Sequence, residues 1–426
     1  MPMFLGPFSD GAGYDRALDL DENDPLADFR RRYVVGDPDL IYLDGNSLGR
    51  LPRETPALVD EVVRRGWGDR LIRSWNEGWW DLQLELGDRL SPLIGASPGE
   101  VIISDSTSVN LYKLAMAAMH ARPARNRIVT DDMNFPTDVY VLQGVADAHD
   151  ASLEIVPTAG ADSPAAAVEA ALDQSTAIVS LSHTAFKSGY TYDLASMTGA
   201  AHRAGALVLW DLSHSVGAMP IELNRSGADL AVGCTYKYLN GGPGSPAFLF
   251  VRADLQSELA NPITAWWGHA EPFAFDLGFR PVEGIRKFHT GTMPILSLAP
   301  VAAGISDVIE AGVPRIRAKS VSLSEYLIEQ WEEHLAPLGL GLASPRDPNR
   351  RGSHVSLSHD EAWPVARALI EIGQVIPDFR APDNLRLGLS PLYTTHIEIH
   401  TALQRLRFIV ESGAHTAFAG ETTIVT

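Results

Sequence analysis

Residues 206–214 read ALVLWDLSH, an apolar run that ends in an aspartate. A run without polar alternation is typical of a strand that is buried on both faces of a parallel sheet. Comparable runs recur at 101–103, 127–130, 152–156, 177–181, 229–234 and 247–251. Stretches with helical spacing lie between most of them, at 109–120, 138–149, 164–173 and 194–204. This alternation predicts an α/β fold with a mostly parallel sheet flanked by helices.

The chain is predicted to have three parts: an N-terminal arm and lead-in at 1–54, a large domain at 55–300 and a smaller C-terminal α/β domain at 301–426. Residues 1–40 are polar, acidic and rich in Gly and Pro, which favours irregular structure. Residues 261–300 are rich in loop signals, and a helical stretch at about 297–335 follows them. The last two strands of the large domain flank a tight glycine-rich turn, so the final strand could be an antiparallel addition.

The composition limits the possible partners. The 426 residues include 34 basic and 53 acidic side chains, a net charge of −19. Nucleic acids and anionic membranes bind basic patches, so neither partner is expected. One cysteine excludes an intrachain disulfide and a cysteine-rich metal site, and no metal centre is expected. The N-terminus lacks signal-peptide features, and no apolar run approaches ~18 residues, so we expect a cytoplasmic protein without a transmembrane helix.

Polar residues follow three of the predicted strands, at the sheet edge where parallel α/β folds bind ligands. The hydroxyl-rich stretch 104–108 begins a helix and can cap it or hold a phosphate. Asp211 can pair with a protonated pyridine nitrogen or cap a loop. Lys237 can form a Schiff base or be a solvated strand-end lysine. Each position alone is ambiguous, but a phosphate holder, a pyridine partner and an aldehyde trap together favour an enzyme that uses pyridoxal 5'-phosphate (PLP).

Three other patterns are expected to carry no chemistry. The stretch 242–247 fits the letters G-x-G-x-x-A, but it precedes a strand and opens no helix, so no dinucleotide site is expected. His396 and His400 have the spacing of a helical metal pair but lack a third ligand nearby, and a surface helix is expected there. Cys234 is expected to be a buried small apolar residue, which disfavours a cysteine desulfurase because that enzyme needs a mobile cysteine.

The chain resembles the kynureninases, fold-type-I PLP enzymes of the aminotransferase class V group. Eight stretches carry the resemblance: LDGNSLG at 43–49, TSVNL at 107–111, NFPTD at 134–138, DLSHSVG at 211–217, TYKYLN at 235–240, WWGH at 266–269, TGT at 290–292 and RLGLSPLY at 386–393. Single pieces are shared with related PLP families, whereas the whole set, which spans about 350 residues in the expected order, is specific.

The resemblance implies roles for particular residues. Lys237 would form the Schiff base and later move protons, Asp211 would pair with the pyridine nitrogen, and Phe135 would stack on the ring. The other implied cofactor contacts are Thr107, Ser108, Thr137, Asp138, Ser182, His214 and Tyr236. Trp266 and Thr292 match positions that reach the phosphate from the partner subunit, which implies a homodimer with shared active sites.

For the substrate, the resemblance implies that Arg386 holds the α-carboxylate, which suits the planar fork of arginine. It also implies that Asn46, Ser47 and Trp75 shape the pocket for the substrate's aromatic ring. A simple turn at 46–47 and a core or interface role for Trp75 remain open alternatives.

The implied reaction is hydrolysis of L-kynurenine, or of its 3-hydroxy form, to anthranilate or 3-hydroxyanthranilate and L-alanine. The oxyanion that develops at the γ-carbonyl needs a donor, for which Tyr236 and an ordered water are candidates. A transaminase of the same fold and a non-catalytic homologue are the alternatives. The presence of both Lys237 and Asp211 disfavours the non-catalytic homologue. The preference between the two substrates, and a role in tryptophan catabolism or in NAD supply, stay open.

Overall fold

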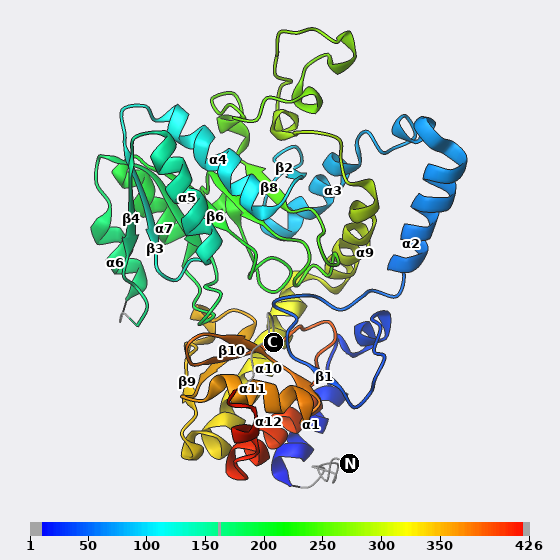
Figure 1. Cartoon of the computed structure of the whole chain (residues 1–426), viewed down its shortest axis with the longest axis vertical. Coiled ribbons are helices and arrows are strands. Elements are labelled where there is room, and N and C mark those ends of the chain that lie inside the picture. The colour runs from blue at the N-terminus through cyan, green and yellow to red at the C-terminus, as the bar shows by residue number, and fades with distance from the viewer. Residues whose placement is uncertain (1–10, 161–162, 421–426) are drawn as a thin grey trace.

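The computed structural model describes residues 11–160 and 163–420. Figure 1 shows two lobes: an upper lobe around the larger sheet, and a lower lobe that holds both the first and the last described helices. Residues 1–10 of the predicted lead-in and residues 421–426 of the predicted C-terminal domain lie outside the described residues. The predicted boundary at residue 300 falls inside α9 (Ile295–Ala311).

The larger sheet has seven strands in the order β2-β8-β7-β6-β5-β3-β4. They are β2 (Val101–Ile103), β3 (Arg127–Asp131), β4 (Ser152–Val156), β5 (Thr176–Ser182), β6 (Leu207–Asp211), β7 (Leu230–Gly233) and β8 (Phe248–Val251). Strands β3 to β7 pair in parallel, and β8 is antiparallel to both of its neighbours. The predicted mostly parallel sheet, with its antiparallel addition, is therefore confirmed.

Helices cover both faces of this sheet, which explains why its central strands β5, β6 and β7 are buried along their whole length. On one face, α4 (Thr107–Ala121) and α5 (Pro136–Ala148) share a core that includes Leu114 and Leu142. The core on the other face is completed by α9 together with α3 (Leu82–Leu90), α6 (Pro164–Ala171) and α7 (Leu194–Ala204). The upper lobe also contains α2 (Thr55–Glu61), which continues into a π-helical segment at Val62–Arg70, and the short α8 (Leu223–Ser226).

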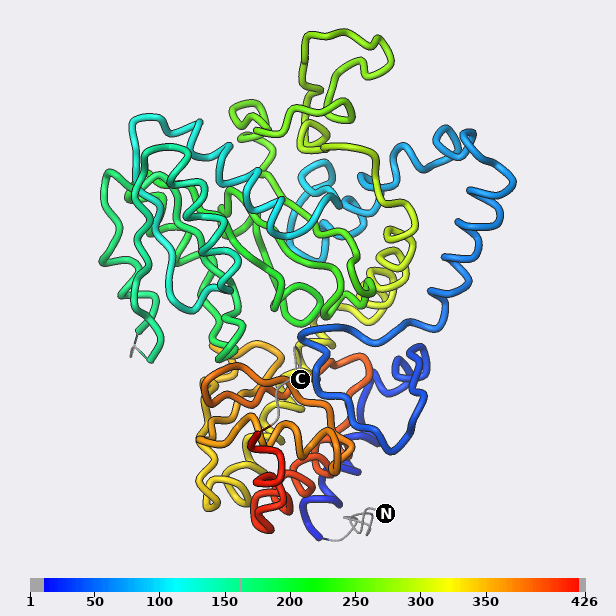
Figure 2. The backbone as a smooth tube through the Cα atoms, viewed as in Figure 1, coloured from blue at the N-terminus to red at the C-terminus, as the bar shows by residue number. Residues whose placement is uncertain are grey.

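The lower lobe is built on a four-stranded antiparallel sheet in the order β12-β13-β10-β9. Its strands are β9 (Gly341–Leu342), β10 (His354–Ser358), β12 (Asp378–Arg380) and β13 (Asn384–Gly388). The helices α10 (Val313–His334), α11 (Ala362–Glu371) and α12 (His396–Glu411) enclose a second core. Figure 2 shows the N-terminal segment beside the C-terminal one: α1 (Ala12–Glu22) packs against α12, and β1 (Ile41–Tyr42) pairs in parallel with β11 (Val375–Ile376).

The irregular structure expected at 1–40 is wrong for α1. Ala17 is buried in the core of the lower lobe. The carboxylate of Asp21 accepts hydrogen bonds from the backbone N–H groups of His396 (2.8 Å) and Ile397 (3.0 Å) at the start of α12. A carboxylate there satisfies unpaired N–H groups and interacts favourably with the helix dipole. The partners that stabilise α1 are distant in the sequence, so local composition could not reveal it.

The helix predicted at 396–400 is confirmed, but its expected surface position is wrong. His396 and His400 are 2% and 4% exposed. His396 contacts Asp21 (2.8 Å) and the hydroxyl of Ser322 (2.9 Å), and His400 lies 2.9 Å from the hydroxyl of Tyr326. Within the described ranges, no group of three or more potential metal ligands occurs.

The helical stretch predicted at 297–335 consists of two helices, α9 and α10, which are bent by 83° at Gly312. Gly312 has a φ of 78°, in the left-handed region that favours glycine, and Pro314 lies in the first turn of α10. No single described helix is long and apolar enough to cross a membrane, and this bent pair meets that criterion jointly, by length and composition alone.

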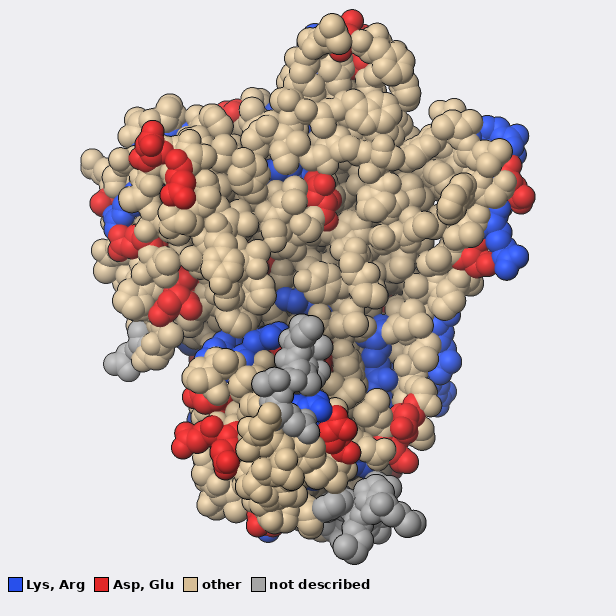
Figure 3. Space-filling model, viewed as in Figure 1, with Lys and Arg blue, Asp and Glu red and all other residues tan. Residues whose placement is uncertain are grey.

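Positive side chains gather between the two lobes. Figure 3 shows lysine and arginine at this junction on the face in view, despite the net charge of −19. Arg386 of β13 crosses the junction to donate a hydrogen bond to the backbone carbonyl of Phe186 in the upper lobe. An anionic ligand would therefore meet favourable local charge there.

Candidate active site

A cavity of about 320 Å³ lies where the lobes meet, at the carboxyl edge of the parallel sheet. We call it the Lys237 cavity. It is lined by Asn46, Ser47, Thr107, Ser108, Phe135, Thr137, Asp138, Asp211, Ser213, His214, Tyr236, Lys237, Arg380 and Arg386. All of these except Ser213 and Arg380 are site residues that the sequence predicts. The tertiary structure thus gathers most of the predicted site from both lobes.

Lys237, shortly after the end of β7, contacts a buried histidine. Its Nζ lies 2.8 Å from Nε2 of His214. Burial, followed by the positive charges of Lys237 and Arg386, holds the pKa of His214 well below its ordinary value. The imidazole is therefore neutral and can accept a hydrogen bond from the lysine. Its Nδ1 is buried and has no hydrogen-bond partner among the described residues, so this atom can serve a ligand.

Two carboxyl groups lie together beside the lysine. Asp211 ends β6, and its Oδ1 accepts hydrogen bonds from the backbone N–H (2.8 Å) and the hydroxyl (2.6 Å) of Ser213. Asp138 lies in the first turn of α5. Burial, and then the negative charge of Asp211, raise the pKa of Asp138 well above its ordinary value. The raised pKa of Asp138 disfavours two negative charges side by side, and the pair can face a cationic ring nitrogen.

Different hydroxyl residues at the start of α4 can serve the two roles that the sequence left open, helix capping and phosphate binding. Ser106 caps the helix, because its Oγ accepts a hydrogen bond from the backbone N–H of Val109 at 3.4 Å. Thr107 and Ser108 line the Lys237 cavity at the positive end of the helix dipole. Hydroxyl and N–H donors at such a position can hold a phosphate.

Arg386 reaches the cavity from β13 and is 1% exposed. Its guanidinium donates hydrogen bonds to the hydroxyl of Ser47 at 3.1 Å and to the carboxylate of Asp378. Burial lowers the pKa of Arg386 to about 10, so it remains charged at neutral pH. Its Nε is buried without a hydrogen-bond partner in the part of the chain that the structure describes. A free N–H on a fixed, charged fork can bind a carboxylate.

Asn46 is fully buried and packs tightly against the strand that carries Arg386. Neither Oδ1 nor Nδ2 of its amide has a partner within residues 11–160 and 163–420. A Cβ atom placed on Gly388 would lie 1.9 Å from Asn46 Oδ1. A buried amide without protein partners is costly unless a ligand satisfies it. Residues 45–47 do form a turn, and within it the side chain of Asn46 is buried.

Ser182, Trp75, Trp266 and Thr292 are predicted site residues that do not line the Lys237 cavity. Ser182 ends β5 directly beside Asp211, and its backbone N–H donates to the side-chain oxygen of Asn134. The other three line a second cavity of about 700 Å³, which we call the aromatic cavity: Ile72, Trp75, Asn76, Trp80, Trp266, Trp267, Pro272, Phe273 and Thr292.

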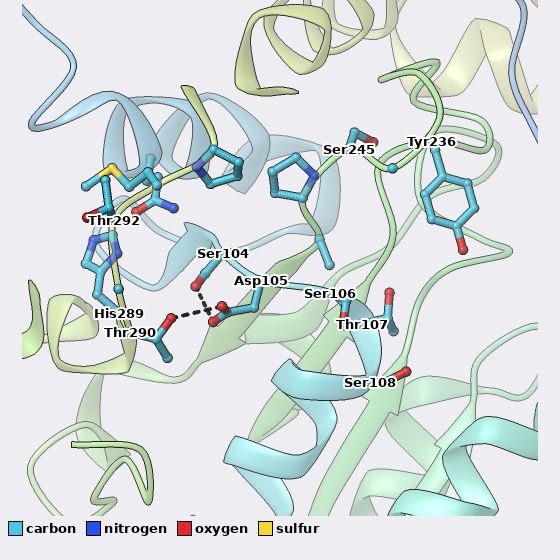
Figure 4. Close-up of a pocket in the computed structure, with 17 residues that line it drawn as sticks. Ser104, Asp105, Ser106, Thr107, Ser108, Tyr236, Ser245, His289, Thr290 and Thr292 are labelled. Carbon is cyan, nitrogen blue, oxygen red and sulfur yellow. Dashed lines mark hydrogen bonds between the residues drawn. The ribbon is translucent and has the colours of Figure 1, made fainter. Parts of the chain in front are cut away.

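A third cavity, of about 410 Å³, lies between the other two, and we call it the hydroxyl cavity. It shares Thr107, Ser108 and Tyr236 with the Lys237 cavity, and Thr292 with the aromatic cavity. Figure 4 shows Tyr236 and the start of α4 on one side of it and Thr292 on the other. Trp75 and Trp266 line neither the hydroxyl cavity nor the Lys237 cavity of their own chain.

Sequence reasoning missed Ser213, Asp378 and Arg380. Ser213 lies inside the motif that carries Asp211 and holds that carboxylate. Asp378 lies between two arginines, with Arg380 at 3.1 Å on one side and Arg386 on the other. A signal was available, since Asp378 and Arg380 occupy alternate positions in a strand that neighbours the one with Arg386. Charges that alternate in a half-buried strand share one face and often face a site.

Known proteins resemble this chain over most of its length. A family model described as the kynureninase C-terminal domain matches residues 316–406. The kynureninase of Pseudomonas fluorescens is 44% identical over 401 residues, covering 92% of this chain and 94% of that protein. The kynureninase of Burkholderia pseudomallei strain K96243 is 44% identical over 409 residues, covering 95% and 97%.

Solved structures share the fold at lower identity. A cysteine desulfurase from Thermococcus onnurineus NA1 has a TM-score of 0.77 and 19% identity, covering 93% of this chain and 98% of that one. A C-DES mutant with glycine covalently linked to its PLP cofactor has a TM-score of 0.77 and 18% identity, covering 88% and 98%. The expected fold is therefore confirmed by these structures. Since the two curated relatives match almost the whole chain at 44% identity, the chain belongs to the kynureninase family.

Proposed function

We propose that the protein is a PLP-dependent kynureninase that hydrolyses L-kynurenine, or its 3-hydroxy form, to anthranilate or 3-hydroxyanthranilate and L-alanine. The observation that carries the proposal is the Lys237 cavity, in which an amine, a buried pair of carboxyl groups and an arginine face one space. The relatives that are 44% identical over most of the chain support the same activity.

The residues of the Lys237 cavity fit PLP. Lys237 is placed to hold the aldehyde, the Asp211–Asp138 pair to hold the pyridine nitrogen, and Thr107 and Ser108 to hold the phosphate at the start of α4. Buried polar atoms that have no partner among the described residues, such as His214 Nδ1 and Asp138 Oδ2, are consistent with a polar ligand. When bound, the cofactor supplies an electron sink that stabilises negative charge on the substrate carbons.

The protein's own groups then move and hold protons. The side-chain amine of Lys237 would be the base that removes the Cα proton. His214 orients this amine by accepting its hydrogen bond at 2.8 Å. Asp211, whose carboxylate is held by the backbone N–H and the hydroxyl of Ser213, would hold the protonated pyridine nitrogen.

Arg386 and Tyr236 act at the two ends of the substrate. Arg386 binds the α-carboxylate and so directs the Cα–H bond toward Lys237. The neighbouring Cys234, followed by burial, raises the pKa of Tyr236, which keeps the phenol protonated. A protonated phenol on the cavity wall is able to donate a hydrogen bond to the oxyanion at the γ-carbonyl. Phe135 packs edge to face on Phe186, with the ring centroids 5.2 Å apart, and supplies a flat wall for the pyridine ring.

We also propose a homodimer in which Trp75, Trp266 and Thr292 complete the partner's site. These residues line the aromatic cavity and not the Lys237 cavity of their own chain. Around them Trp67, Ile72, Phe273 and Phe275 are 61%, 76%, 64% and 77% exposed. An apolar surface of this kind favours burial against another protein surface. Mass measurement tests the dimer, and mixed dimers of Lys237→Ala and Trp266→Ala chains should recover one complete site.

A product assay tests the activity. Purified protein with PLP and kynurenine should release fluorescent anthranilate and alanine without any keto-acid acceptor, and Lys237→Ala should release neither. Dependence on a keto acid would indicate a transaminase instead. A desulfurase is disfavoured because Cys234 is 2% exposed and follows the end of β7. The ratio of kcat/KM for the two substrates decides the preference between kynurenine and its 3-hydroxy form.

The cytoplasmic location and the lack of nucleic-acid and membrane partners are part of the same proposal. The lack of nucleic-acid and membrane partners is supported by the net charge of −19, which disfavours anionic partners. Cell fractionation that recovers the activity with membranes would contradict them.

A further inference from the structure

Lys113 of α4 is a buried lysine that the proposed reaction does not use. Its side chain is 0% exposed, and Nζ donates to Asp105 Oδ2 (2.7 Å), to the backbone carbonyl of Phe288 (2.8 Å) and to Ser104 Oγ (3.4 Å). Three acceptors match the three N–H bonds of an ammonium group. An ion pair with a buried member contributes little to stability in itself, so this one points to control over the position of the segments that it joins.

Asp105 connects this lysine to a second segment. Its Oδ1 accepts a hydrogen bond from the hydroxyl of Thr290 at 2.9 Å, and Figure 4 draws this contact. Its backbone has a φ of 47°, an uncommon conformation for a residue other than glycine. The backbone N–H of Ala247 donates to its carbonyl at 2.8 Å and helps to hold it there.

The two segments that meet at Asp105 both face the hydroxyl cavity. Thr107 and Ser108 lie two and three residues after Asp105, and they also line the Lys237 cavity. The segment Phe288–Thr292 is attached twice, by Phe288 to Lys113 and by Thr290 to Asp105, and Thr292 also lines the aromatic cavity. Asp105 is therefore two residues from Thr107, and its partner Thr290 is two residues from Thr292.

We propose that Asp105, held by Lys113, is a positioning residue for two active sites of the dimer. It sets the start of α4 for the PLP bound to its own chain, and through Thr290 it sets Thr292 for the PLP bound to the partner. The inference rests on the proposed function and on the shared sites proposed with it. The two sites are thus linked through the half-buried carboxylate of Asp105.

The Thr290→Val variant tests the contact, because it removes the hydroxyl but keeps the side-chain shape and the Lys113–Asp105 pair. The measurement is the Kd for PLP, obtained by titrating cofactor-free protein with PLP and recording the tryptophan fluorescence. We expect Kd to rise about fivefold, the effect of one lost hydrogen bond. Thr290→Ser, which keeps the hydroxyl, should stay within about twofold of the parent.

A matched control removes a different threonine–aspartate hydrogen bond. The hydroxyl of Thr158 donates to Asp132 at 2.9 Å, and Asp132 retains hydrogen bonds from two backbone N–H groups. Thr158→Val should therefore leave the Kd for PLP within about twofold of the parent. A fivefold rise in this variant would show that losing any such hydroxyl weakens PLP binding, and it would contradict a special role for Thr290.

Mixed dimers test which site each contact serves. A dimer of one Thr290→Val chain and one Lys237→Ala chain has a single Lys237, which lies in the Thr290→Val chain. The site around this Lys237 receives an intact Thr290–Thr292 segment from the Lys237→Ala chain. We expect the absorbance of lysine-bound PLP in this dimer to titrate as in the parent. The Asp105→Asn homodimer should bind PLP more weakly than the parent. In the mixed dimer with a Lys237→Ala chain, PLP binding should be only partly restored, because the start of α4 in the Asp105→Asn chain is still displaced.

The outcomes distinguish the two parts of the proposal, the link from Asp105 to the partner's site and the role of Asp105 in its own site. An unchanged Kd in the Thr290→Val homodimer, or a mixed dimer that stays about fivefold weaker, overturns the link to the partner's site. Full restoration of Asp105→Asn in the mixed dimer overturns its role in its own site. If Asp105→Asn does not fold, the Thr290→Val dimers still decide whether the link to the partner's site exists. A parent protein that binds no PLP would instead reject the proposed function.

Discussion

Asp378 and Arg386 lie directly opposite each other on the neighbouring strands β12 and β13, and their side chains form an ion pair beside the Lys237 cavity. The side chain of Asp378 is 3% exposed and that of Arg386 is 1% exposed. Removing one member of a buried pair leaves the other charge without compensation. Asp378 therefore sets the direction in which the Arg386 fork faces the cavity.

Replacing Asp378 by asparagine should raise KM for kynurenine about tenfold and leave kcat within about threefold, because the α-carboxylate anchor loses its orientation but Lys237 is untouched. Steady-state kinetics measures both constants. Asp383→Asn is the matched control, since the Asp383 carboxylate pairs with Lys187 at 3.8 Å in an exposed position. A fall in kcat at constant KM would contradict the orienting role of Asp378.

Replacing Arg386 by lysine keeps the positive charge but removes the planar fork. We expect KM to rise about 10- to 100-fold, because one charge-assisted, bidentate contact is lost. The Kd for PLP should stay within about twofold, since the groups proposed to hold PLP lie in the upper lobe. Equal losses of substrate and cofactor affinity would show that Arg386 serves the cofactor site instead.

Replacing Lys237 by alanine should abolish turnover and the absorbance of lysine-bound PLP, because the covalent anchor and the base at Cα are the same amine. The melting temperature without cofactor should change little, which separates lost chemistry from lost folding. A Lys237→Ala protein with near-normal turnover would remove the basis of the proposed mechanism.

Replacing Gly388 by alanine should impair substrate binding through steric overlap. The new Cβ would lie 1.9 Å from Asn46 Oδ1, which forces the buried amide or strand β13 to move. We expect KM to rise at least about tenfold, because Arg386 lies on the same strand. Gly278→Ala, where no atom lies within 4 Å of the added carbon, is the control and should behave as the parent. Equal kinetics for both variants would contradict the tight packing of Asn46.

The contact between Asp21 and α12 predicts a pH-dependent stability. Burial raises the pKa of Asp21, but the hydrogen bonds from His396 and Ile397 together lower it by more. The net pKa therefore lies below the ordinary value of 3.8. A depressed folded pKa stabilises the protein above the unfolded pKa, and the contribution is lost as pH falls through the folded pKa. Asp21→Asn should therefore cost about 1 kcal/mol in the free energy of unfolding at pH 7, and the difference should shrink below about pH 4.

Denaturant unfolding of both proteins between pH 7 and pH 3 measures this difference. Asp19→Asn, on the exposed side of α1, should show no comparable loss. A difference between Asp21→Asn and the parent that grows on acidification would mean that the carboxylate is not favoured in the folded state.

The sequence by itself determined the parallel sheet and the residues at its carboxyl edge. Strands that are covered on both faces must be apolar throughout, so β5, β6 and β7 stand out in the chain. Asp211 ends β6, Lys237 follows β7, and the hydroxyls at 104–108 follow β2. Their common location at the carboxyl edge of the sheet could therefore be predicted.

The tertiary structure alone decided which distant groups meet. Asp21 contacts a residue 375 positions away, and Asp105 contacts Thr290 across 185 positions. The pairing of Asp378 with Arg386 likewise depends on the register of two strands. Periodicity reports which face of one element is buried, because burial acts locally along that element. The partner of a buried charge is set by how separate elements pack, and no local pattern records that.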